Sequence, residues 1–128
     1  TGFDSIPVSF RRPVAYVNYV PVGHCFTWNN SSLLLAKHHV DAESNRELSL
    51  SKIFARGIGF RVVASCYETK GVDLIENTPE EIRDVAIEMD ERLAGTWQAH
   101  PEDEALQQSF WEIFPTDAID AHKGNPLH

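Results

Sequence analysis

The sequence has 128 residues, 42% of them hydrophobic and 23% charged, and a formal net charge of −8. This composition is typical of a folded globular domain and argues against a disordered chain. Apolar stretches stay shorter than the ~20 residues that a bilayer-spanning helix needs, and the first residues lack the pattern of a signal peptide. An acidic chain without a basic stripe is also a poor candidate for nucleic-acid binding. We therefore expect one cytoplasmic α/β domain over residues 1–128, in which residues 96–128 form a C-terminal helical extension.

The charge is distributed unevenly along the chain. Residues 1–75 hold eight Lys and Arg against six Asp and Glu, whereas residues 76–128 hold three against thirteen. An anionic ligand is therefore expected to bind to the first 75 residues rather than to the remainder.

The first half of the chain reads as a short helix, two strands and a second helix. Residues 4–10 predict the short helix, with Asp4 or Ser5 as its cap. Residues 13–20 are almost continuously apolar, which is typical of a strand buried on both faces of a parallel sheet. A polar loop over 21–32 leads to the short apolar run 33–36, which is either a strand or a packed loop. Residues 41–47 indicate a surface turn, and a helix from about Leu50 to Arg56 should end at Gly57.

The second half contains the clearest local signal. Residues 60–67 and 72–75 predict two further strands. Thr78, Pro79 and Glu81 then combine a helix N-cap, a proline at the first helical position and a capping box. That helix should run to Gly95, and an amphipathic helix should follow from about residue 101 to 114. Strands that alternate with helices predict a parallel sheet, with this last helix pair packed over it.

A set of stretches, in chain order, carries a family resemblance. They are Thr1-Gly2, residues 10–14, residues 17–21, Thr27-Trp28, residues 35–37, residues 46–49, residues 75–82, Glu88-Met89 and residues 107–111. Together they resemble the glycosyltransferases of bacterial surface-carbohydrate biosynthesis, whose C-terminal domain is similar to that of GT-B enzymes. The resemblance covers nearly the whole chain. It implies a Rossmann-like parallel sheet flanked by helices, the C-terminal half of a GT-B-type fold, truncated at both ends.

The resemblance also implies a function. The chain would be part of an enzyme that transfers a sugar from a nucleotide-diphosphate donor to a glycan acceptor, and this half would hold the donor. The acceptor site and any catalytic base would come largely from the other half, so the chain alone should be inactive. The open sheet edge left before Thr1 should be covered by a second copy, which predicts a homodimer.

The expected donor site begins at Thr1 and Gly2. A glycine turn that opens onto a helix presents free backbone N–H groups to a phosphate, so Thr1, Gly2, Asp4 and Ser5 are expected to bind the donor. The alternative is that Asp4 and Ser5 only cap the helix.

Three further residues complete the candidate donor site. Asn18 is a polar residue within an apolar strand and needs a partner, so a structural hydrogen bond to a neighbouring loop competes with ligand contact. Lys37 could pair with phosphate, against the alternative of a solvent-facing lysine. Trp28 is the loop aromatic most suited to ligand contact, although the same loop could use it for packing.

A metal site is not expected, and no cofactor is implied. His38 and His39 are adjacent, so in a strand they would face opposite ways and could not chelate together. The HExxH spacing of zinc enzymes does not occur in the sequence either.

Two other functions remain open. The chain could be a non-enzymatic, stand-alone α/β interaction domain that shares only a fold with the transferases. It could also be a fragment of a nucleotide-sugar epimerase, but that reading would require a GxGxxG turn, and the sequence has none.

Overall fold

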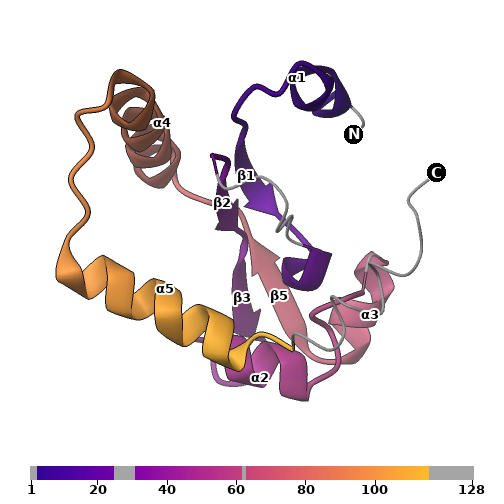
Figure 1. Cartoon of the computed structure of the whole chain (residues 1–128). Coiled ribbons are helices and arrows are strands. Elements are labelled where there is room, and N and C mark those ends of the chain that lie inside the picture. Colours follow the sequence, from indigo (N-terminus) through magenta and orange to yellow (C-terminus); the bar gives the residue numbers. More distant parts are fainter. Residues whose placement is uncertain (1–2, 25–30, 62, 116–128) are drawn as a thin grey trace.

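The computed structural model describes residues 3–24, 31–61 and 63–115, which fold into two small sheets with helices around them (Figure 1). Strand β1 (Ala15–Tyr19) pairs in parallel with β2 (Leu33–Ala36). The second sheet has the order β4-β3-β5, with β3 (His38–Asp41) antiparallel to both β4 (Arg46–Glu47) and β5 (Val72–Ile75). The α/β class is therefore confirmed, but the expectation of one parallel sheet is wrong for the described residues.

The two sheets meet at Lys37. Strands β2 and β3 are separated by this residue alone, so one extended segment pairs first with β1 and then with β4 and β5. The backbone N–H of Lys37 donates to the carbonyl of Tyr19 at 3.0 Å, which ends the parallel pairing. The antiparallel part arises because β5 returns along β3 immediately after a helix and a turn at Gly71, whose φ is +67°.

The described residues form five α-helices: α1 (Ser5–Ser9), α2 (Leu50–Ala55), α3 (Ala64–Thr69), α4 (Pro79–Ala94) and α5 (Pro101–Ile113). The helices expected at 4–10, 50–56, 78–95 and 101–114 are all confirmed, as are the strands expected at 13–20 and 72–75. The run 33–36, for which a strand and a packed loop were both open, is the strand β2. A short 3-10 helix, η1 (Val22–His24), follows β1.

The strand expected over residues 60–67 is wrong, because most of that segment's described part is the helix α3. Its residues have a mixed apolar pattern that either structure can bury. In the structure only Tyr67 of α3 is buried, and its hydroxyl donates to the carbonyl of Arg61 at 2.7 Å. One anchored aromatic side chain is enough for a short helix, whereas a strand would need a partner along its length.

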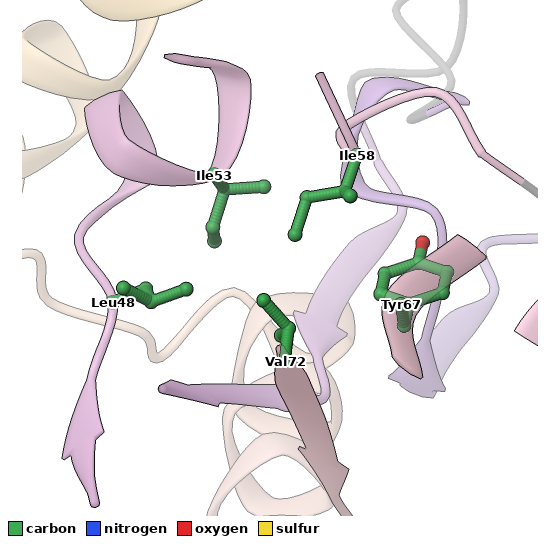
Figure 2. Packing of buried hydrophobic residues seen from close by; sticks show 5 residues of the cluster. All are labelled: Leu48, Ile53, Ile58, Tyr67 and Val72. Atoms are coloured by element: carbon green, nitrogen blue, oxygen red, sulfur yellow. The ribbon is translucent and has the colours of Figure 1, made fainter. Parts of the chain in front are cut away.

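The core lies beside the antiparallel sheet. It consists of Leu48, Ile53, Ile58, Tyr67 and Val72, which converge from α2, α3, β5 and the connections between them (Figure 2). Ile58 is completely buried.

The parallel pair lies apart from this core. Ala15 and Val17 on β1 are exposed, and the other β1 residues are only half-buried. The expectation that this strand is buried on both faces is therefore wrong, because helices of the described chain do not cover both sides of it. The apolar run reflects its β-branched and aromatic composition, which favours a strand wherever it packs.

Helix α4 is built as its sequence predicts. Thr78 Oγ1 accepts a hydrogen bond from the N–H of Glu81, and the Glu81 carboxylate accepts one from the N–H of Thr78. At the other end Gly95 adopts φ +76° and stops the helix. Helix α4 contacts β1 and β2, whereas α5 contacts α2, where Phe114 meets Phe54 with ring centres 5.3 Å apart. The expected packing of both helices over the sheet is thus right for α4 only.

Candidate functional site

Two asparagines join the parallel strands to the start of α4. The N–H of Asn18 donates to Asn77 Oδ1 at 2.7 Å, and the N–H of Asn77 donates to Asn18 Oδ1 at 2.6 Å. Asn77 also donates from Nδ2 to the carbonyl of Ala36 at 2.8 Å and is almost fully buried. Asn18 has φ +52°, a conformation that asparagine tolerates better than most residues. The structural hydrogen bond weighed as the alternative for Asn18 is therefore confirmed.

Lys37 lies at the same edge, where β1 and β2 end. Its ammonium group is 3.7 Å from Glu76 Oε1, and its side chain is 24% exposed, against 75% for that of Glu76. A pair this long, with one partner mostly in solvent, adds little stability. Lys37 is therefore half-covered and loosely held.

The N-terminus of α4 faces this edge but is already occupied by its own side chains. The Glu81 carboxylate and the Thr78 hydroxyl satisfy backbone N–H groups of the first turn. Glu80 and Glu81 also place negative charge there. This helix end is consequently stabilised by carboxylates of the chain, and it is less suited to an external anion than a bare N-terminus would be.

His38 connects three elements at the edge, a role that the sequence analysis missed. Its Nδ1 is 2.8 Å from Glu47 Oε1 on β4, and its Nε2 is 2.9 Å from Glu81 Oε1 on α4. These two hydrogen bonds, to Glu47 and then Glu81, raise the pKa of His38 above its ordinary value, and burial only partly opposes them. The bond to His38 and the bond from Thr78 lower the pKa of Glu81.

His39 points the opposite way, as the strand alternation predicts. It is 2% exposed, its Nδ1 lies 2.9 Å from the carbonyl of Lys37, and its ring centre is 5.9 Å from that of Tyr67. Burial lowers the pKa of His39, so the neutral ring is favoured. Across the described segments there is no group of three His, Cys, Asp or Glu side chains arranged to hold a metal ion.

The candidate residues on α1 lie toward the start of β1. Asp4 is the N-cap residue, but its side chain makes no capping hydrogen bond. Its Oδ2 instead accepts from the hydroxyl of Tyr16 at 3.4 Å, and burial together with this carboxylate raises the pKa of Tyr16. The carbonyl of Ser5 accepts from Ser9 Oγ at 2.7 Å. Thr1, Gly2 and Trp28 lie outside the described residues.

The structure thus brings together two of the expected donor-binding residues, Asn18 and Lys37. Asp4 is held near Tyr16, at the second position of β1, and not at the end of the strand.

A surface hollow of about 400 Å³ lies at the other end of the parallel pair. It is lined by Pro13, Ser31, Leu33, Met89, Arg92, Leu93, Gly95 and Trp97. The Arg92 guanidinium stands 5.2 Å from the ring centre of Trp97 and pairs with Glu88. The hollow and the Asn18–Lys37 edge therefore lie at opposite ends of β2.

None of the helices in the described part of the chain combines the length and the apolar composition that crossing a bilayer requires. The sequence matches no family model, and neither a curated protein nor a solved structure resembles it significantly.

Proposed function

We propose that this chain is part of a glycosyltransferase, and that it helps to bind the diphosphate of a nucleotide-sugar donor where β1 and β2 end. One observation carries the proposal. Asn18 and Lys37, both expected from the sequence to bind the donor, lie at the same carboxyl edge of a parallel strand pair. Ligands of open α/β sheets bind beyond the carboxyl ends of parallel strands.

The chemistry of the two side chains suits a phosphate. The Lys37 ammonium group is a compact point charge, and its partner Glu76 is exposed enough to turn away into solvent. A diphosphate carries more negative charge than one carboxylate and would compete well for this cation. The side-chain nitrogen of Asn18, Nδ2, makes no hydrogen bond within the described part of the chain, which leaves it as a donor for a phosphate oxygen.

The distribution of apolar side chains supports a role as one part of a larger assembly. Among the described residues, eight hydrophobic side chains are buried and eleven large ones are exposed. A surface so apolar is typical of protein that is covered by another domain or subunit. In the proposed enzyme, the other half would supply the acceptor site and the catalytic base.

Calorimetric titration with UDP and with GDP tests the proposal. We expect a weak but saturable binding heat for the wild type, no sugar transfer by this chain alone, and a severalfold loss of affinity in Lys37→Met. Lys70→Met is the matched control, because this exposed lysine follows α3 and precedes β5, whose opposite end leads to Glu76. Equal heats for all three proteins would reject the site.

A second variant separates the two parts of the expected donor site. Gly2→Asp adds a carboxylate at a position to which the resemblance assigns the diphosphate, and it leaves Lys37 unchanged. We expect it to weaken nucleotide binding as well. If Lys37→Met lost nucleotide affinity and Gly2→Asp did not, the donor site would be restricted to the edge where β1 and β2 end.

The alternative function, a stand-alone interaction domain, is favoured by one surface. Phe3, Ile6 and Phe10 are 76%, 55% and 74% exposed; Ile6 lies within α1, and the two phenylalanines flank this helix at spacings of three and four residues from Ile6. That alternative would be supported if titration with UDP and GDP gave no binding heat and the protein associated with a partner through this surface.

A further inference from the structure

The contacts of His38 impose a requirement on its protonation. Both ring nitrogens lie within hydrogen-bond distance of carboxylate oxygens, Glu47 Oε1 on one side and Glu81 Oε1 and Oε2 on the other. An ionised carboxylate only accepts hydrogen bonds, so each ring nitrogen must carry a proton. Only the imidazolium form has both. A neutral ring would satisfy one carboxylate and direct a lone pair at the other.

The two carboxylates come from different elements, so the histidine links two separate parts of the chain through one ring. Glu47 belongs to the two-residue strand β4, and Glu81 belongs to the first turn of α4. Glu81 Oε2 also accepts from the Thr78 N–H, so its carboxylate is shared between the helix cap and His38.

The other groups around His38 do not substitute for it. Its register partner on β5 is Ile75, which does not titrate, and the next residue, Glu76, pairs with Lys37. His39 lies on the other face of β3, where burial lowers its pKa and favours the neutral ring. Within the described chain, His38 is the cation-forming side chain that hydrogen-bonds to both Glu47 and Glu81.

We propose that charged His38 is a pH-dependent pin that seats the first turn of α4 against β3 and β4. When the ring loses its proton, one of its two hydrogen bonds to carboxylates is lost and the start of α4 loosens. Asn77 directly precedes the Thr78 cap, so loosening would also disturb the Asn18–Lys37 edge. That last consequence rests on the proposed donor site, whereas the pin itself does not.

The direction of the pH dependence follows from the pKa shifts of His38 and Glu81. The pKa of His38 is raised above 6.5, so its contribution is complete below about pH 6.5 and is lost as the pH rises through the folded-state value. The pKa of Glu81 is lowered from 4.5, so its contribution is present above about pH 4.5 and is lost as the pH falls through the folded-state value. The pin is closed between these limits, opens on the alkaline side when His38 loses its proton, and opens on the acid side when Glu81 gains one.

Amide exchange in the first turn of α4 measures the pin directly. The relevant amides are those of Glu81 and Ile82, which donate to Thr78. We expect their protection, corrected for intrinsic exchange rates, to fall roughly two- to fivefold in the wild type between about pH 6 and about pH 8.5, the range expected for a partly exposed ion pair.

Three variants make the test specific. His38→Gln carries no charge and should give low, pH-independent protection. His38→Arg remains charged throughout and should remove the pH dependence while the first turn stays protected. His100→Gln changes an exposed histidine at the start of α5 and should behave as the wild type does.

Protection that is flat in the folded wild type, or a His38→Gln profile that follows the wild type, overturns the pin. If His38→Gln does not fold, the comparison of wild type with His38→Arg still decides, because equal pH profiles in these two overturn it. UDP titration at both pH values separates the proposals. A pH-dependent first turn without any nucleotide binding supports the pin and rejects the donor site, whereas nucleotide binding with a pH-independent first turn does the reverse.

Discussion

Asn18 and Asn77 exchange hydrogen bonds in both directions, each side-chain oxygen accepting from the other residue's backbone N–H. The two residues are 59 positions apart. Their pairing fixes the end of β1 relative to the start of α4, and the bond from Asn77 Nδ2 to Ala36 adds the end of β2. One buried side chain therefore aligns three elements at the proposed donor edge.

The first prediction concerns this junction. Asn77→Ala removes the acceptor for Asn18 and the donor for Ala36, and leaves two partly buried backbone groups unpaired. We expect it to lower the free energy of unfolding in urea by about 2–4 kcal/mol. Asn18→Gly should cost less, about 1 kcal/mol, because it loses one acceptor but glycine adopts φ +52° without strain. If Asn77→Ala were no more harmful than Asn18→Gly, the junction would not contribute as its geometry indicates.

The second prediction concerns two helix caps that look alike in sequence. Thr78→Ala removes the hydroxyl that accepts from the Glu81 N–H, and should cost about 1 kcal/mol of unfolding free energy. Ser49 occupies the same position before α2 but makes no side-chain capping bond. Ser49→Ala should therefore change the unfolding free energy by less than about 0.5 kcal/mol. Thermal or urea unfolding of both variants gives the comparison, and equal losses would contradict it.

Local features of the sequence were sufficient for four of the five helices in the described residues, α3 being the exception. Thr78, Pro79, Glu81 and Gly95 lie within one helix, and every interaction that sets its ends is between residues close in the chain. Strand pairing was not predictable in the same way. The apolar runs at β2 and β5 indicate strands, but nothing near them specifies that the chain changes sheets at Lys37 or that β5 runs antiparallel to β3.

In the candidate site, too, local features were predictable from the sequence and long-range contacts were not. A polar Asn18 in an apolar strand requires a partner, and this much follows from the cost of an unpaired buried polar group. That the partner is Asn77 depends on long-range packing. His38 was missed for a similar reason, because its partners Glu47 and Glu81 are 9 and 43 positions away and meet only when β3 pairs with β4 and α4 docks.

The third prediction concerns the exposed apolar face of α1. Strand β1 pairs with β2 alone among the described strands, and Phe3, Ile6 and Phe10, in and around α1, are exposed. We expect concentration-dependent dimerisation in sedimentation velocity, weakened by Ile6→Glu. Leu106→Glu, at an equally exposed leucine on α5, is the control and should leave the association unchanged. A wild type that stays monomeric at high concentration would contradict the expected homodimer.

The fourth prediction uses the opposite behaviour of the second histidine. Burial lowers the pKa of His39 from 6.5, so the unfolded chain takes up a proton that the folded chain refuses. The stability that His39 contributes is therefore present above about pH 6.5 and is lost as the pH falls through the folded-state value. His39→Phe keeps a ring against Tyr67 and cannot titrate, but it loses the bond between Nδ1 and the Lys37 carbonyl.

The variant should accordingly cost about 1 kcal/mol of unfolding free energy at about pH 8, where His39 is neutral in both states. On acidification to about pH 5 the wild type should lose more stability than His39→Phe, so the difference between the two proteins narrows or changes sign. His38 remains in both proteins, so its own pH dependence cancels in that difference. Urea unfolding at the two pH values gives the measurement. Parallel losses in the two proteins would mean that the buried ring accepts its proton as readily as an unfolded histidine, which the burial of the His39 side chain, only 2% exposed, argues against.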